Sequence, residues 1–206
     1  MFDSIGIIIK GGPVMVPLLA CSIISLAVVI ERIIFWRKAR SRAPVEELLQ
    51  LVERREFAKA AELGRKLDLP AARVLTAGLR HRNPSLAKAM EVAAQAQIPV
   101  LKKRLTILDT IITLAPLLGL LGTITGMISS FGIMSEAGLG QPHAVTGGVA
   151  EALIATAAGL LIAILTLIPY NYFSNRAERE LEEIEYYGSR LELLLDEQEG
   201  KANQNI

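Results

Sequence analysis

The amino-acid sequence predicts an all-α integral membrane protein with three transmembrane helices and further helices outside the membrane. Hydrophobic residues make up 51% of the chain, and they are concentrated in three long apolar runs. The charged residues, 21% of the chain, lie mostly between and after these runs, and the mean hydropathy is +0.40. Such segregation is typical of a multi-pass membrane protein rather than of a soluble domain.

The first span is predicted at residues 13–36. Its central part, Val14–Ile30, carries no charged residue and is just long enough to cross a bilayer core of about 30 Å. Trp36 suits the membrane interface, and the prolines stand in the first turns, where a helix tolerates them. The preceding segment, 1–12, is equally compatible with a small amphipathic helix at the membrane surface and with a frayed terminus.

The region between the first two spans, residues 37–104, has the pattern of several short amphipathic helices. Helices are predicted from Pro44, over 56–67 and over 70–80. A longer pattern from Ser85 can continue without a stop into the second span, with Pro99 expected to kink or interrupt it. These helices are too short to form a large independent core, so we expect them to pack on one another and on neighbouring subunits.

The second and third spans are predicted at 105–134 and 147–174, joined by a loop at 135–146. A charged amphipathic helix and tail, 175–206, follow, with the last seven residues expected to be disordered. Apolar residues recur along this helix at helical spacing: Leu181, Ile184, Leu191, Leu194 and Leu195. This stripe is compatible either with an oligomer contact or with packing on the helix's own subunit.

Lysine and arginine predict the orientation, because they gather on the cytoplasmic side of membrane spans. They follow the first span, precede the second and follow the third, whereas the loop 135–146 has none. We therefore expect the N-terminus and that loop outside, and the region 37–104 and the C-terminus in the cytoplasm.

The chain offers little for catalysis, and the expectation is that it is not an enzyme. No metal-ligand cluster is evident, and the two histidines, His81 and His143, fall in segments on opposite sides of the membrane. The glycines of the second span match no nucleotide-binding fingerprint. No catalytic residue, metal or cofactor is therefore predicted, and no basic patch points to nucleic acid.

Small residues recur every fourth position in the last two spans. Such rows let helix backbones approach closely in lipid. The predicted packing residues are Gly119, Gly122 and Gly126 in the second span and Ala155 and Gly159 in the third. Packing within one subunit is the ordinary role of such rows, and the sequence favours it for the glycines.

Two threonines and one glutamate are the candidate functional residues. Thr123 and Thr156 each lie about a dozen residues from the outer end of an antiparallel span, which predicts that they lie at the same depth. Their hydroxyls can form a polar belt around a pore, or each can bond back to its own helix. Glu151 lies inside the third span and, at about 100° per residue, points well away from Thr156. It is a candidate polar contact or proton-accessible group.

Other acidic residues near the membrane have a simpler interpretation. Asp109 lies near the cytoplasmic end of the second span, after three basic residues, and Glu31 lies beside Arg32. For both, an ion-paired or solvated residue at the membrane edge is favoured over a role in proton transfer.

Two segments resemble the MotA/TolQ/ExbB proton channel family. They are APLLGLLGTITGMISSF at 115–131 and GGVAEALIATAAGLLIAILTLIPYNYF at 147–173. The order of spans also fits, and three spans resemble the ExbB or TolQ branch more than flagellar MotA. One departure is AILTLIP, which has its proline at Pro169 where family members often have a helix-breaking AIPA-like segment.

The resemblance implies a pentameric bundle in the bacterial inner membrane, with the N-terminus in the periplasm. The bundle has a central pore, which encloses the single spans of a dimeric ExbD- or TolR-like partner. The partner would supply the aspartate that binds the proton. The family's pore threonines correspond to Thr123 and Thr156, and its pore-associated glutamate to Glu151. The expected function is a proton-channel subunit of an energy-transducing motor that drives TonB-dependent transport. The alternatives are a TolQ-like subunit that acts through a TolA-like transducer, and a purely structural membrane scaffold.

Overall fold

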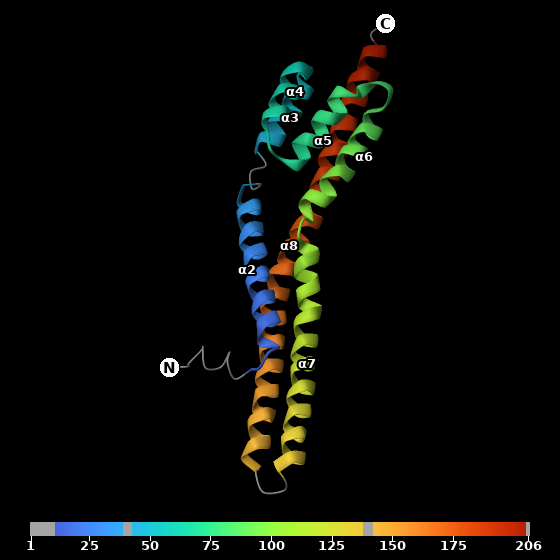
Figure 1. The fold of residues 1–206 in the computed structure, drawn as a ribbon. Coiled ribbons are helices and arrows are strands. Elements are labelled where there is room, and N and C mark those ends of the chain that lie inside the picture. The colour runs from blue at the N-terminus through green and yellow to red at the C-terminus, as the bar shows by residue number, and fades with distance from the viewer. Residues whose placement is uncertain (1–10, 39–42, 138–141, 205–206) are drawn as a thin grey trace. The chain divides into compact units, whose positions relative to one another are not determined.

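The computed structural model describes residues 11–38, 43–137 and 142–204, and the elements in these ranges are α-helices (Figure 1). They are α2 (Met15–Lys38), α3 (Ala43–Glu53), α4 (Phe57–Lys66), α5 (Pro70–Arg80), α6 (Arg82–Leu101), α7 (Leu105–Ala137) and α8 (Pro142–Gln204). The expectation for the N-terminal segment falls outside the described residues, except for a turn at residues 11–14.

The chain forms two compact units, each of which combines distant parts of the sequence. Unit 1 contains the chain up to Arg32 and Arg104–Tyr172. Unit 2 contains Ile33–Lys103 and the chain from Phe173 onward. The candidate residues named above all belong to unit 1.

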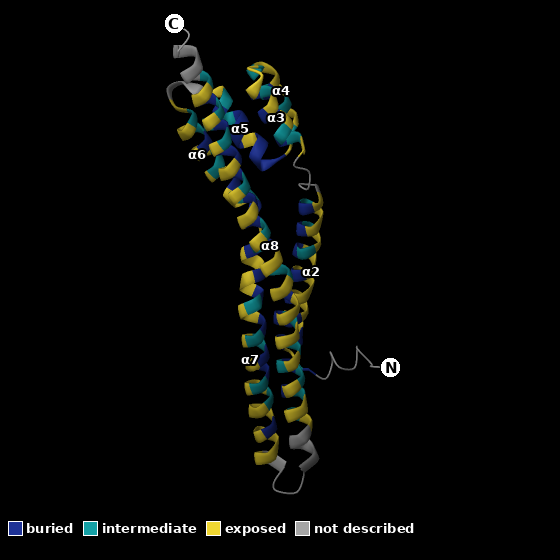
Figure 2. Ribbon diagram, turned by 180° about the vertical axis from the view of Figure 1, so that it is seen from behind, coloured by how far each residue is buried: buried dark blue, intermediate teal, exposed yellow. Residues whose placement is uncertain are grey.

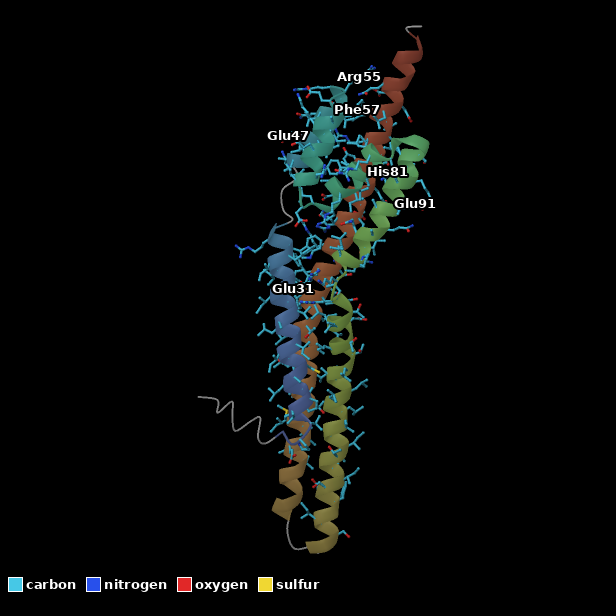
Figure 3. All side chains as sticks on the ribbon, turned by 45° about the horizontal axis from the view of Figure 1, so that its top comes forward. Glu31, Glu47, Arg55, Phe57, His81 and Glu91 are labelled. Carbon is cyan, nitrogen blue, oxygen red and sulfur yellow. The ribbon has the colours of Figure 1, made fainter. Side chains whose placement is uncertain are left out.

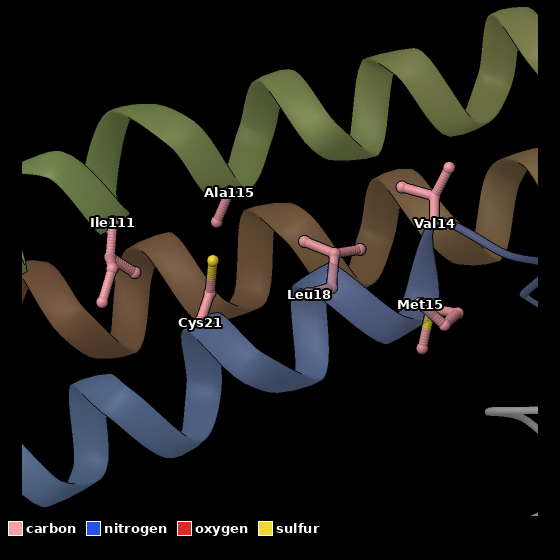
Figure 4. Packing of buried hydrophobic residues seen from close by; sticks show 6 residues of the cluster. All are labelled: Val14, Met15, Leu18, Cys21, Ile111 and Ala115. Carbon is pink, nitrogen blue, oxygen red and sulfur yellow. The ribbon is translucent and has the colours of Figure 1, made fainter.

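Unit 1 is a layer of long helices in which α2, α7 and α8 run side by side (Figure 1). Its core lies where the start of α2 packs on α7 and α8, as Figure 4 shows. The residues of this core are Val14, Met15, Leu18, Cys21, Ile111 and Ala115. Leu118, Ala158 and Ile162 pack against it, so both α7 and α8 contribute.

The outer faces of unit 1 are exposed, as the yellow stretches of its helices in Figure 2 show, and they carry large apolar side chains. Leu117 and Ile128 on α7 and Leu161 and Ile168 on α8 are all more than half exposed. Among the described residues, three helical stretches are long and apolar enough to cross a membrane, and they begin at Met15, Leu105 and Gly147. Exposed apolar side chains on such helices are stable in lipid, so the structure fits the predicted multi-pass membrane protein.

Several helix ends differ from the predicted boundaries. α7 continues to Ala137 and α8 begins at Pro142, a residue suited to the first helical turn, so both helices extend into the loop predicted at 135–146. The pattern from Ser85 does not run into the second span, since α6 ends at Leu101 and Arg104 has a positive φ of 62°.

The third span and the C-terminal helix form one continuous helix, although the chain divides into its two units between Tyr172 and Phe173, near the predicted boundary. Pro169 lies inside the continuous helix α8, and that helix extends to Gln204, into the tail that was expected to be disordered. Pro99 likewise lies inside α6, two residues before its end, and so does not interrupt it.

Unit 2 packs α3–α6 with the last part of α8. Leu48, Val52 and Leu75 are fully buried in it, together with Leu191 of α8. Arg190 of α8 donates hydrogen bonds of 3.0 Å to both carboxylate oxygens of Glu46. The apolar stripe of the C-terminal helix thus packs on its own subunit, since Ile184, Leu191 and Leu195 are buried within the single chain.

Candidate functional site

The candidate site starts from a close contact between α7 and α8. A methyl group placed on Gly119 would lie 2.9 Å from Thr156 Cα and 3.0 Å from the Ala155 carbonyl oxygen. One placed on Gly159 would overlap the carbonyl group of Ala115. At these positions the backbones touch, so only glycine fits.

The same contact continues towards the C-terminal end of α7 and the N-terminal end of α8. A methyl group on Gly122 would lie 2.6 Å from the Ala155 Cβ, and one on Gly126 would lie 2.9 Å from the Ala152 Cβ. All five predicted packing residues therefore lie in one seam between α7 and α8. We refer to Gly119, Gly122, Gly126, Ala155 and Gly159 as the small-residue seam.

The two candidate threonines use their hydroxyl hydrogens differently. The Thr156 hydroxyl donates to the Gly119 carbonyl oxygen at 2.9 Å, across the seam. The Thr123 hydroxyl donates to the Leu120 carbonyl oxygen at 2.6 Å, within its own helix. In both cases the acceptor is a carbonyl, so each hydroxyl has used its only hydrogen and its oxygen can still accept a hydrogen bond.

The threonines lie on neighbouring turns rather than at one level. Thr156 packs at the level of Gly119, and Thr123 is four residues further along α7, a rise of about 6 Å. The offset arises because the antiparallel register is set by the small-residue seam. Both side chains are half-buried, so neither is sealed in the core.

Glu151 lies on a different face of α8 and contacts the start of α2. A methyl group on Gly12 would overlap the Glu151 carboxylate oxygen Oε1, which places the carboxylate directly against the Gly12 backbone. Ile154, one turn further along α8, lies 3.3 Å from the corresponding position on Gly11. Glu151 thus faces α2 while Thr156 faces α7, as the angular spacing predicts, and the structure does not bring their side chains together.

Two polar contacts of unit 1 were not predicted. The hydroxyls of Ser25 in α2 and Thr166 in α8 lie 2.8 Å apart and are buried. Ser130 of α7 is also buried and contacts the backbone at Gly148 of α8. The sequence signal for such contacts is an isolated hydroxyl residue in an apolar run. A hydroxyl that faces lipid can bond only to its own helix backbone, so a second hydrogen-bond partner must come from a neighbouring helix.

Charged residues meet at the other end of α2, where Figure 3 labels Glu31. Arg32 is 1% exposed and donates to both carboxylate oxygens of Glu31, at 2.9 and 2.8 Å. Arg104 lies 3.6 Å from the same carboxylate. The ion-paired interpretation of Glu31 is the observed one. Asp109 is exposed.

Within the described ranges, no group of three or more His, Cys, Asp and Glu residues could hold a metal ion. Among the three candidate residues, Thr123 and Thr156 offer hydroxyl groups for hydrogen bonding, and only Glu151 carries a carboxylate that can bind a proton.

Comparison with known proteins decides the family. The model of the MotA/TolQ/ExbB proton channel family matches residues 66–186. An ExbB-like biopolymer transport protein of Synechocystis sp., numbered 3, is 39% identical over 191 residues, which cover 89% of this chain and 91% of the relative. The chain belongs to the MotA/TolQ/ExbB proton channel family.

Other members of the MotA/TolQ/ExbB family support the ExbB/TolQ type. A second ExbB-like protein of Synechocystis sp. is 36% identical over 203 residues, covering 92% of this chain and 78% of the relative. The Tol-Pal system protein TolQ of Pseudomonas aeruginosa is 41% identical, but over 93 residues that cover 45% of this chain and 40% of TolQ. The family match includes Thr123, Glu151 and Thr156.

Proposed function

We propose that the chain is the proton-channel subunit of an inner-membrane motor, in which several copies, five by family resemblance, surround the single-span helices of an ExbD/TolR-like dimer. The motor uses the proton motive force to act through a TonB-like periplasmic transducer on transport across the outer membrane. The protein is a channel and energy transducer rather than an enzyme.

The observation that carries the proposal is the hydrogen bonding of the two threonines. Both hydroxyls donate to backbone carbonyls, so each oxygen can interact with a ligand only as a hydrogen-bond acceptor. A protonated carboxyl group of the partner can donate to such an oxygen, whereas an ionised carboxylate has no hydrogen to give. The threonines therefore favour the protonated form of the partner's aspartate, and deprotonation weakens its hold on this position.

The difference in hydrogen bonding between the protonated and the ionised aspartate can couple proton movement to movement of the inner helices. A proton from the periplasm neutralises the aspartate and lets it settle beside Thr123 or Thr156 in one subunit. Release of the proton to the cytoplasm ionises the aspartate and favours its departure. Because two inner helices cannot match five surrounding subunits symmetrically, successive protonation events move the inner helices relative to the ring. The orientation used here, with the N-terminus periplasmic, rests on the distribution of lysine and arginine.

An ExbB-type output is placed first because the two relatives that match about nine tenths of the chain are named ExbB-like. The extent of the match does not itself separate the two outputs, since proteins named ExbB from Aquifex aeolicus and Xanthomonas campestris cover 39% and 45% of the chain, and TolQ covers 45%. A TolQ-like subunit that acts on a TolA-like protein in envelope integrity is the second candidate, supported by 41% identity in the matched segment.

The test is proton flux in membrane vesicles that contain the chain with its single-span partner. Thr123→Val and Thr156→Val remove the hydroxyls at nearly constant volume, and each is expected to reduce partner-dependent flux at least tenfold, about 1.4 kcal/mol. Thr125→Val is the matched control, because Thr125 also donates to carbonyls of α7, at 3.0 and 3.2 Å, but has no place in the proposed path.

The mass of the extracted complex, measured with and without the partner, separates the channel from a membrane scaffold. A scaffold would give the same partner-free oligomer in both samples and unchanged flux in both threonine variants. Wild-type flux in Thr123→Val and in Thr156→Val would remove the pore assignment even if the complex assembles.

A further inference from the structure

Gly12 has a backbone conformation that other residues rarely adopt. Its φ is +73°, in the left-handed region. The Met15 N–H donates to the Gly12 carbonyl at 3.0 Å, and the Val16 N–H donates to the Pro13 carbonyl at 3.2 Å, so the turn leads directly into α2. Glycine enters this conformation without the strain that a side chain causes.

The space beside Gly12 is filled by Glu151. The carboxylate oxygen Oε1 overlaps the position that a Gly12 Cβ would take, and the Glu151 Cδ and Cγ lie 3.0 and 3.4 Å from it. Two independent constraints, the left-handed φ and the occupied Cβ position, therefore require glycine here. The carboxylate of Glu151 lies beside the N-terminus of α2, where negative charge is favourable.

The turn is held in place from both sides. Gly11 is buried and packs on Met15 of α2 and Ile154 of α8. Val14 is also buried, and its Cβ lies 3.6 Å from the Cβ position of Gly122 on α7 (Figure 4 shows Val14 at the start of α2). A turn fixed to both α7 and α8 can act as a rigid support for the side chain that it touches.

We propose that the turn at residues 11–13 holds the Glu151 carboxylate in place. In this proposal Gly12 is a positioning residue that determines where the carboxylate lies in the third span. The inference rests on the proposed function only for the role that it gives to Glu151 in proton movement. The first span is then more than a peripheral anchor, because its beginning fixes the one acidic side chain within the apolar part of α8.

The test measures the reaction of Glu151 with a water-soluble carbodiimide and an amine, read from the mass of its peptide, in the full-length protein in membranes. Gly12→Ala places a methyl group where the carboxylate stands and moves the carboxylate away from the turn that covers it. The rate of Glu151 labelling is expected to rise several-fold. Gly132→Ala is the control for adding a methyl group to a glycine of unit 1, because nothing lies within 4 Å of the corresponding position.

A second pair of variants separates displacement from backbone strain. Glu151→Asp shortens the side chain by one methylene and leaves room for the methyl group. Gly12→Ala is therefore expected to change labelling at position 151 much less in the Glu151→Asp background, although the strain at Gly12 is the same in both. Equal labelling rates in wild type and Gly12→Ala, or equal effects in the two backgrounds, would overturn the proposal.

The labelling needs neither the partner nor proton flux, so its outcome is independent of the proposed function. If Gly12→Ala alters labelling but Glu151→Gln leaves flux unchanged, the positioning of Glu151 by the turn is supported and the role of Glu151 in proton movement is rejected. If Glu151→Gln abolishes flux but labelling is insensitive to Gly12→Ala, the positioning of Glu151 by the turn is rejected and the proton-channel function is supported.

Discussion

The Ser25 and Thr166 hydroxyls lie 2.8 Å apart between α2 and α8, and both side chains are buried. Thr166 also donates to the Ile162 carbonyl oxygen at 2.7 Å, so Ser25 supplies the hydrogen of the bond between the hydroxyls. Together with the Gly12–Glu151 contact, this bond joins α2 to α8 at two points along its length.

Removing this bond is expected to loosen α2 without unfolding the α7–α8 pair. Ser25→Ala and Thr166→Val should each cost about 1 kcal/mol, and the double variant should cost little more than either single one, because both remove the same bond. Unfolding from mild detergent by a denaturing detergent measures these differences. Fully additive costs would show that the two hydroxyls act separately.

The small-residue seam predicts a sharp contrast between two glycines. Gly159→Ala drives a methyl group into the Ala115 backbone and should destabilise the α7–α8 pair by about 1–3 kcal/mol. Gly132→Ala is the control, because nothing lies within 4 Å of the corresponding position and alanine favours the helix. Stability measured by the same detergent titration should fall only for Gly159→Ala, and equal losses would contradict the seam.

The buried ion pair at the other end of α2 predicts a loss of stability when Glu31 is neutralised. Glu31→Gln removes a carboxylate to which the guanidinium of Arg32, which is 1% exposed, donates two hydrogen bonds, and it should cost about 1–3 kcal/mol. Thermal unfolding of the variant and the wild type measures this cost, and equal stability of the two proteins would reject the argument.

Acid sensitivity is expected at α4. The hydrogen bond from Lys66, at 2.8 Å, lowers the pKa of Glu62 below its ordinary value of 4.5, and Lys59 does the same for Glu56. Because the folded pKa is lowered, the stabilisation is present above the ordinary value and is lost as pH falls through the folded pKa. Lys59→Gln with Lys66→Gln should therefore flatten the stability change measured from about pH 6 to about pH 3. Both carboxylates are exposed, so the effect is small.

Helical periodicity predicted most of the fold. α5 has the predicted bounds, and the three apolar runs became the three long helices. The stop after Leu101 was missed because the local signal at Arg104 is a backbone φ of 62° on a residue that rarely adopts it. The continuity of α8 through Pro169 was missed because a proline at this place can either break a helix or be accommodated in it.

The contacts of the candidate residues could be predicted only in part. Four-residue spacing identified the small-residue seam, and angular spacing separated Glu151 from Thr156. The register between α7 and α8 depends on which backbone segment each glycine contacts. This register places Thr123 about one turn away from Thr156. The contact between Gly12 and Glu151 joins residues far apart in the sequence, and no local pattern encodes it.

The composition of the small-residue seam has an entropic consequence. Glycine and alanine have no rotamers to freeze, so bringing α7 against α8 costs almost no side-chain entropy once both helices are formed. The same property leaves no side chain at these positions that can adapt by changing rotamer. In unit 1, the α7–α8 pair is therefore expected to respond to a load as one body, with any repacking confined to the larger side chains around the seam.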